Sequence, residues 1–347
     1  MGKNILSTIT RYLLIGIVFP FLVQYVIYFR FTPNYNINAF SEAHIKEGSN
    51  KGVFRYRVLG TDLHLWLYHK LSKIPTIRDM KENPLYEKRL FYLDKDADKT
   101  FYFTYFLVAL FFSILTSVFM LLIFDSGPFF EMTLQEKIFI PACLSLFIGL
   151  TNFVVTPYDN LSYFLLILAI FCFLKFLQTR IGLYFMGVCC IILLSTLNRE
   201  SSLLIVSFIA GIYISIYKIT DFRWVRKMIL PTLCFMIPYF GLRFFLGGDS
   251  SVSEGSKLLA NLSFFKISKL SGVLFVPFFF YCILNMTSLK ANRILIRNFL
   301  IMAAPYIIII PLVGILIEYR LWLPVLIPVI VLSRLNVEVF FARVKPD

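Results

Sequence analysis

Long apolar runs alternate with short polar connections along most of this chain. An α-helix crosses a bilayer with about 20 apolar residues, so each run of that order predicts one transmembrane helix. We therefore expect an all-α, polytopic membrane protein with about ten transmembrane helices. The predicted transmembrane helices cover residues 12–29, 101–124, 138–155, 161–177, 181–197, 202–217, 228–245, 270–284, 299–317 and 321–332.

Prolines interrupt the last two predicted transmembrane helices. They are Pro305 and Pro311 in the first of the two, and Pro324 and Pro328 in the second. A proline removes one backbone hydrogen bond and kinks a helix, so we expect bends near this end of the chain. The short run 321–332 fits a full span, a re-entrant segment or part of a bent helix.

The longest polar segment, residues 30–100, follows the first predicted span. Within it, residues 61–74 carry Leu63, Trp66, Leu67 and Leu71 at helical spacing. This pattern predicts a helix that lies in the membrane interface. Residues 83–93 predict a second, weaker surface helix. With no internal repeat and no soluble domain, residues 1–347 form one predicted membrane domain, and residues 30–100 form its first outer loop.

Composition excludes a soluble enzyme. Hydrophobic residues make up 59% of the chain, charged residues make up 16%, and the mean hydropathy is +0.77. The net charge of +14 comes mostly from Lys and Arg in short connections, so we expect contact with membrane lipids and no nucleic-acid partner. The positive-inside rule predicts both termini in the cytoplasm and residues 30–100 outside. The expected location is a bacterial inner membrane.

Four polar clusters are predicted on the outer face. They are Phe54-Arg55-Tyr56-Arg57, Thr156-Pro157-Tyr158-Asp159-Asn160, Asn198-Arg199-Glu200-Ser201 and Glu318-Tyr319-Arg320. Closely spaced guanidinium groups beside aromatic rings favour an anionic, partly apolar ligand such as a lipid phosphate. Arg243, near the outer end of its span, is a further candidate phosphate contact. The alternatives are interfacial anchoring by the arginines and ordinary capping of the helices.

These clusters resemble motifs of the GT-C superfamily of membrane glycosyltransferases. The resemblance is carried by Phe54-Arg55-Tyr56-Arg57, which is similar to the "PYRYR" stretch of many bacterial members, by Asn198-Arg199-Glu200, and by Glu318-Tyr319-Arg320 before a proline-rich last span. It implies transfer of a sugar from a polyprenyl-phosphate carrier to an extracytoplasmic acceptor, either a glycan or a lipid-linked molecule. Members usually carry an Asp or Glu soon after the first span, whereas residues 31–39 contain neither.

The implied reaction needs a base, cations for the leaving phosphate and an apolar groove for the prenyl chain. The candidate catalytic bases are Glu42, Asp159 and Asp62. The candidate phosphate ligands are Arg55, Arg57, Arg199 and Arg320, with Glu200 and Glu318 orienting them. Tyr56, Tyr158 and Tyr319 are expected to stack on sugar rings or to line the entrance.

No cofactor or metal is expected, because His44, His64 and His69 lack the spacing of metal ligands. All six cysteines lie in or at the end of apolar runs and predict no disulfide framework. Three other functions fit the same pattern: an O-antigen type polysaccharide polymerase, a non-catalytic GT-C-like subunit, and a lipid or solute transporter. A transporter would favour ionisable residues near the bilayer midplane, but here they lie at the ends of the spans.

Overall fold

The computed structural model describes residues 2–30, 41–49, 55–75, 98–217, 219–247, 261, 267–316 and 318–344. These residues form helices and no strand, with a single isolated β-bridge between Phe130 and Leu335. The predicted second surface helix, residues 83–93, lies outside the described residues. The chain is a multi-pass membrane protein built from apolar helices, as its sequence predicts.

Six helices in the described ranges are long and apolar enough to cross a membrane. They are the continuous helix α1–η1–α2 (Gly2–Arg11, Tyr12–Val18 and Phe19–Arg30), α7 (Lys99–Phe124), α8 (Leu134–Thr151), α9 (Asp159–Thr179), η6–α11 (Glu200–Ser202 and Leu203–Tyr217) and α12 (Arg223–Leu246). Local capping sets some of their starts. Asp98 accepts hydrogen bonds from the first amides of α7, and Thr133 and Glu136 form a capping box at α8.

The remaining apolar helices are shorter or bent, so ten full spans are not established. Three are short: α10 (Gly182–Asn198), α14 (Ile267–Leu284) and α17 (Tyr319–Ser333). The predicted span 299–317 is instead a pair of helices, α15 (Lys290–Met302) and α16 (Ala304–Val313), bent by 56° at Ala303 just before Pro305. Helix α17 is continuous despite Pro324 and Pro328, and most of its residues are buried.

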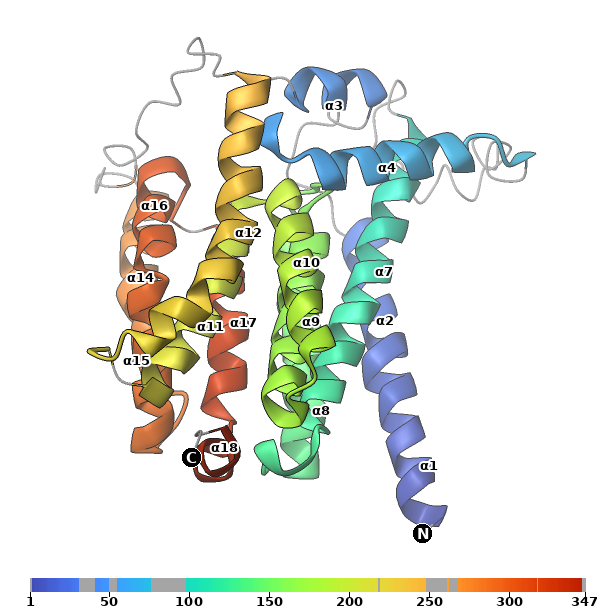
Figure 1. Cartoon of the computed structure of the whole chain (residues 1–347). Helices are drawn as coiled ribbons and strands as arrows, with labels where there is room; N and C mark the ends of the chain where they lie inside the picture. Colours follow the sequence, from blue (N-terminus) through green and yellow to red (C-terminus); the bar gives the residue numbers. More distant parts are fainter. Residues whose placement is uncertain are drawn as a thin grey trace.

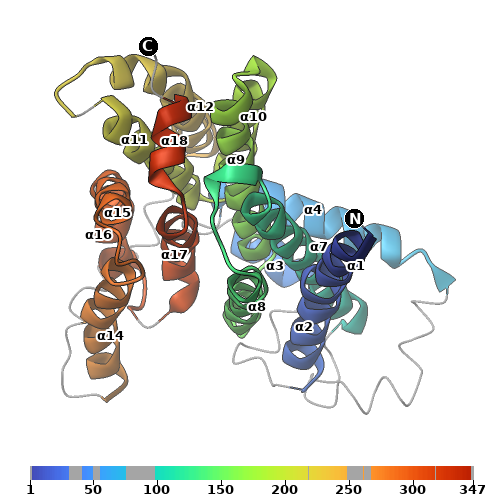
Figure 2. The same cartoon turned by 90° about the horizontal axis from the view of Figure 1, so that it is seen from below.

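The helices run side by side as a bundle with two distinct ends (Figure 1). The N-terminus and α18 (Val337–Val344) lie at one end, which we call the termini end. Helices α3 (Glu42–Ser49) and α4 (Val58–Leu71) lie across the other, which we call the α4 end. Seen along the bundle, α17 lies among its neighbours, whereas α14 lies at the edge (Figure 2). Trp322 of α17 is 2% exposed.

Helix α4 is the helix predicted over residues 61–74, and small and polar residues are among those that it buries against the bundle. Gly60 and His64 are buried, whereas Trp66 is 57% exposed. The glycine is required by close packing, because a Cβ atom at position 60 would lie 2.6 Å from Asn198 Oδ1 and 2.9 Å from Tyr158 Cα. Helix α4 is thus seated directly on the start of α9 and the end of α10.

A closed ring of hydrogen bonds joins four helices below α4. Gln24 donates to Ser113 Oγ (2.7 Å), Ser113 to Asn160 Oδ1 (3.4 Å), Asn160 to Asn152 Oδ1 (2.7 Å) and Asn152 to Gln24 Oε1 (2.7 Å). All four side chains are buried, so each depends on the others for its partners. Because Asn160 follows Asp159, the ring fixes the first turn of α9.

Candidate functional site

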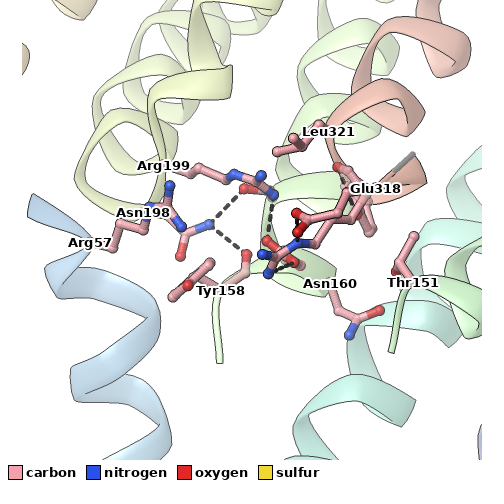
Figure 3. Close-up of polar contacts among 12 residues, drawn as sticks. Arg57, Thr151, Tyr158, Asn160, Asn198, Arg199, Glu318 and Leu321 are labelled. Carbon is pink, nitrogen blue, oxygen red and sulfur yellow. Dashed lines mark hydrogen bonds and ion pairs between the residues drawn. The ribbon is translucent and has the colours of Figure 1, made fainter. Parts of the chain in front are cut away.

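The four polar clusters predicted from the sequence meet at the α4 end. Arg57 precedes α4, Tyr158 and Asp159 begin α9, and Arg199 and Glu200 connect α10 to η6. Glu318 and Arg320 lie at the start of α17. Figure 3 shows Arg57, Tyr158, Asn198, Arg199 and Glu318 gathered around one small volume. Segments far apart in the sequence therefore build one site.

One half of the site is buried and its charges balance. Asp159 accepts a hydrogen bond from Arg199 Nη1 and lies 3.6 Å from Arg320 Nη1. Arg320 Nε in turn donates to Glu318 Oε2 at 3.1 Å. Asp159 is 1% exposed and Arg199 is 3% exposed, so the pair is closed to solvent. Two guanidinium groups face two carboxylates, as burial of charge requires. We call these four residues the balanced half.

Asn198 connects the balanced half to its surroundings. Its Nδ2 donates to the Tyr158 carbonyl at 2.9 Å and to Ser162 Oγ at 3.0 Å. These bonds hold the end of α10 against the start of α9, while Gly60 of α4 packs on Asn198 from the other side. The side chain fixes the relative positions of Asp159 and Arg199, and so has a structural role.

The other half of the site is more open and carries excess positive charge. Glu200 lies between two cations, 3.5 Å from Arg57 Nε and 3.6 Å from Arg243 Nη2. Arg55 is close by, where its guanidinium and the Tyr56 hydroxyl both donate to the Gly247 carbonyl, at 3.4 and 3.3 Å. Of the residues that the structure describes here, three arginines and one carboxylate give this half a formal charge of +2. We call it the open half.

Aromatic rings hold the cations of the open half. The guanidinium of Arg243 lies 4.5 Å from the Tyr56 ring centroid and 3.6 Å from that of Tyr239, and Arg57 lies 4.5 Å from that of Tyr158. Stacking of this kind fixes a guanidinium and leaves its edge available for hydrogen bonds. Tyr239 is absent from the sequence prediction. It lies four residues before Arg243, and that helical spacing is the signal that could have found it.

Two of the predicted bases have no described contact with either half of the site. Glu42 of α3 pairs with Lys46 (2.5 Å) and with His69 of α4 (3.4 Å). The hydrogen bond from Lys46 lowers the pKa of Glu42. Asp62 is exposed on α4. Asp159 is the only predicted base that the structure brings together with the described arginines of the site.

An apolar groove starts beside the balanced half. Its volume is about 390 Å³, and it lies between α8, α14 and α17. Its lining includes Phe147, Leu150, Thr151, Phe275, Phe279, Cys282, Tyr319, Trp322 and Leu326. Tyr319, which was predicted to stack on a sugar ring or to line the entrance, lines this groove and contacts Phe275. The next residue along the chain, Arg320, belongs to the balanced half.

His64 lies on the buried face of α4, between the rings of Tyr105 (3.9 Å) and Phe101 (4.7 Å). Burial lowers its pKa to about 3, so it is neutral at physiological pH. Among the residues that the structure describes, no three His, Cys, Asp or Glu side chains group as a metal site would require. Comparisons with protein-family models, curated proteins and solved structures find no match to this chain.

Proposed function

We propose that this protein is a membrane glycosyltransferase that moves a sugar from a polyprenyl-phosphate carrier to an extracytoplasmic acceptor. The observation that carries the proposal is the open half, where Arg57 and Arg243 flank Glu200, the carboxylate among the described residues of this half, and Arg55 binds the nearby Gly247 carbonyl. Its net charge of +2 is complementary to the phosphate monoester dianion that leaves on transfer, and it also attracts the donor, a phosphodiester with one negative charge. The balanced half is neutral and its Asp159–Arg199 pair is closed to solvent, so the donor phosphate is assigned to the open half.

Transfer of a glycosyl group releases negative charge on the carrier phosphate, because the bond between the anomeric carbon and the phosphate oxygen breaks. Guanidinium groups that are already in place stabilise that charge without reorganisation. In the open half, Arg243 is held by two rings and Arg57 by one, which meets this requirement. The tyrosine rings also offer flat faces for sugars.

The apolar groove supports a lipid-linked substrate. It is lined almost entirely by aromatic and aliphatic side chains of membrane helices, and Tyr319 links it to Arg320 of the polar site. An isoprenoid chain is apolar and branched, and a groove of about 390 Å³ accommodates several of its units. The proposed location is a bacterial inner membrane, with the α4 end facing outward.

A turnover assay tests the proposal. The full chain in lipid nanodiscs is incubated with a panel of undecaprenyl-phosphate-linked sugars and a membrane glycolipid extract, and release of undecaprenyl phosphate is followed by mass spectrometry. We expect release with at least one donor, and a loss of at least about 100-fold in Arg243→Ala. Arg226→Ala, an exposed arginine toward the other end of the same helix, is the matched control. Absence of release with every donor contradicts the proposal.

A further inference from the structure

The carboxylates at the α4 end differ in how firmly they are held. Asp159 is hydrogen-bonded to Arg199, and Glu318 accepts a hydrogen bond from Arg320 at 3.1 Å. Both belong to the balanced half, and Asp159 is closed to solvent. A base must reach the hydroxyl of its substrate directly or through one water molecule. The two carboxylates of the balanced half are therefore poorly placed to accept a substrate proton.

Glu200 is held differently. Its two cationic neighbours stand at 3.5 and 3.6 Å, which is longer than a charged hydrogen bond. Its Oε1 is buried and has no hydrogen-bond partner, as is also true of Asp159 Oδ2, but 26% of the Glu200 side chain is exposed against 2% of the Asp159 side chain. Glu200 is thus a carboxylate inside the open half with hydrogen-bonding capacity to spare.

We propose that Glu200 is the catalytic base of this site, an assignment that rests on the proposed glycosyl transfer. The Glu200 carboxylate takes the proton from the acceptor hydroxyl. The acceptor oxygen forms a bond to the anomeric carbon of the donor sugar, and the bond from that carbon to the phosphate oxygen breaks. The electron pair leaves with the carrier phosphate, whose charge Arg57 and Arg243 stabilise.

Donor binding would bring the leaving group and the base together. Arg57 and Arg243 stand at 3.5 and 3.6 Å from the Glu200 carboxylate, so a phosphate that binds these two guanidinium groups lies beside Glu200. An acceptor hydroxyl at the anomeric carbon of that donor is then within reach of the base.

The isosteric variant Glu200→Gln tests the assignment in the full chain. Two quantities are measured in nanodiscs: the dissociation constant for undecaprenyl phosphate, and kcat and KM for the best donor of the turnover assay. We expect kcat to fall by about 100-fold to 10,000-fold, with KM within about threefold of the wild-type value. Undecaprenyl phosphate should bind as tightly as before or more tightly, because a competing negative charge is gone. Glu200→Asp should retain more turnover than Glu200→Gln.

The matched control is Glu338→Gln on α18 at the termini end, which should leave both quantities unchanged. Full turnover by Glu200→Gln overturns the assignment while the proposed function stands. Loss of undecaprenyl phosphate binding together with turnover also overturns it, because Glu200 would then only position the arginines. If Glu42→Gln or Asp62→Asn loses turnover while Glu200→Gln stays active, the catalytic base is Glu42 or Asp62 and not Glu200. If the wild-type protein releases undecaprenyl phosphate from none of the donors, the proposed function is wrong, and the assignment of the base falls with it.

Discussion

Asp159 at the start of α9 accepts a hydrogen bond from Arg199, which lies 40 positions later in the chain, and both side chains are almost completely buried. Arg320 of α17 completes the arrangement from a third segment. The pair therefore joins three parts of the bundle at the point where α4 covers it. Its first consequence concerns stability, because a buried charge that loses its partner is costly.

We expect Arg199→Ala to lower the free energy of unfolding by about 3–5 kcal/mol, because Asp159 keeps only the longer contact with Arg320. The double variant Asp159→Asn, Arg199→Met should lose less, since Arg320 and Glu318 still balance each other. Reversible unfolding in mixed micelles measures both values. A single variant within about 0.5 kcal/mol of wild type, the range expected for the surface control Arg226→Ala, contradicts the structural role.

Gly60→Ala should lift α4 from the bundle. The added Cβ atom would meet Asn198 and Tyr158 at less than 3 Å, and neither the Tyr158 backbone nor the hydrogen-bonded Asn198 can move freely. The expected cost is about 1–3 kcal/mol in unfolding free energy, together with reduced turnover. Gly241→Ala in α12 is the control, because, apart from the backbone of its own helix, no atom lies within 4 Å of the position that its Cβ atom would take. Equal stability of the two variants would show that α4 is not seated as described.

The free energy of unfolding should decrease as the pH falls below about 6.5, because His64 is buried in its neutral form. Its pKa is about 3 in the folded protein and about 6.5 in the unfolded chain, so the unfolded state binds the extra proton. The stabilisation is complete above the unfolded pKa and is lost as the pH falls toward 3. Between about pH 8 and pH 5 the loss is about 2 kcal/mol.

His64→Phe should therefore flatten the pH dependence of unfolding, while a variant of the exposed His69 should keep most of it. Melting temperatures measured from pH 8 to pH 5 check this. An unchanged slope in His64→Phe would mean that another group causes the acid sensitivity.

The closed ring of hydrogen bonds formed by Gln24, Ser113, Asn160 and Asn152 predicts strong energetic coupling between these side chains. Gln24→Leu leaves Ser113 and Asn152 without one partner each, at a cost of about 1–3 kcal/mol. Asn152→Leu should cost a similar amount. The double variant should cost clearly less than the sum of the two, because both changes break the same ring. Additive effects in a double-mutant cycle would show that the four side chains act independently.

Cys282 provides a probe of the groove. It is a free, exposed thiol that lines the groove, whereas Cys190 is a free, exposed thiol on α10. A membrane-soluble thiol reagent should modify both, and undecaprenyl phosphate should slow the modification of Cys282 at least about fivefold if the chain occupies the groove. Site-resolved mass spectrometry measures each rate, with Cys190 as the control. Equal protection of the two thiols would point to general lipid shielding.

The sequence predicted the positions of the apolar helices well, because the length and hydropathy of a span are properties of one contiguous run. Helices α7 and α9 agree with the prediction to within a few residues. The prolines of the predicted span 299–317 also predicted a bend, and the chain bends by 56° at Ala303, just before Pro305. The contact of Asn261 with the carbonyls of Pro311 and Gly314 at the end of α16 was not predicted, because no local pattern contains it.

For the site, the sequence identified the polar clusters but not how their charges pair. That Asp159 pairs with Arg199 while Glu200 stays between Arg57 and Arg243 depends on three-dimensional placement. The separation into a balanced and an open half follows only from that pairing. The hydrogen-bonded ring of Gln24, Ser113, Asn160 and Asn152 was missed because its members come from different helices, whereas Tyr239 lies on the same helix as Arg243 and could have been found from that spacing.

The most direct test of the account compares binding of undecaprenyl phosphate with binding of undecaprenol, which has the same chain and no charge, by native mass spectrometry. We predict that the wild-type protein prefers the phosphate by at least about tenfold and that Arg57→Ala, Arg243→Ala abolishes the preference without loss of undecaprenol binding. Equal affinity for the two lipids in the wild-type protein, or an unchanged preference in the double variant, would contradict a phosphate site in the open half.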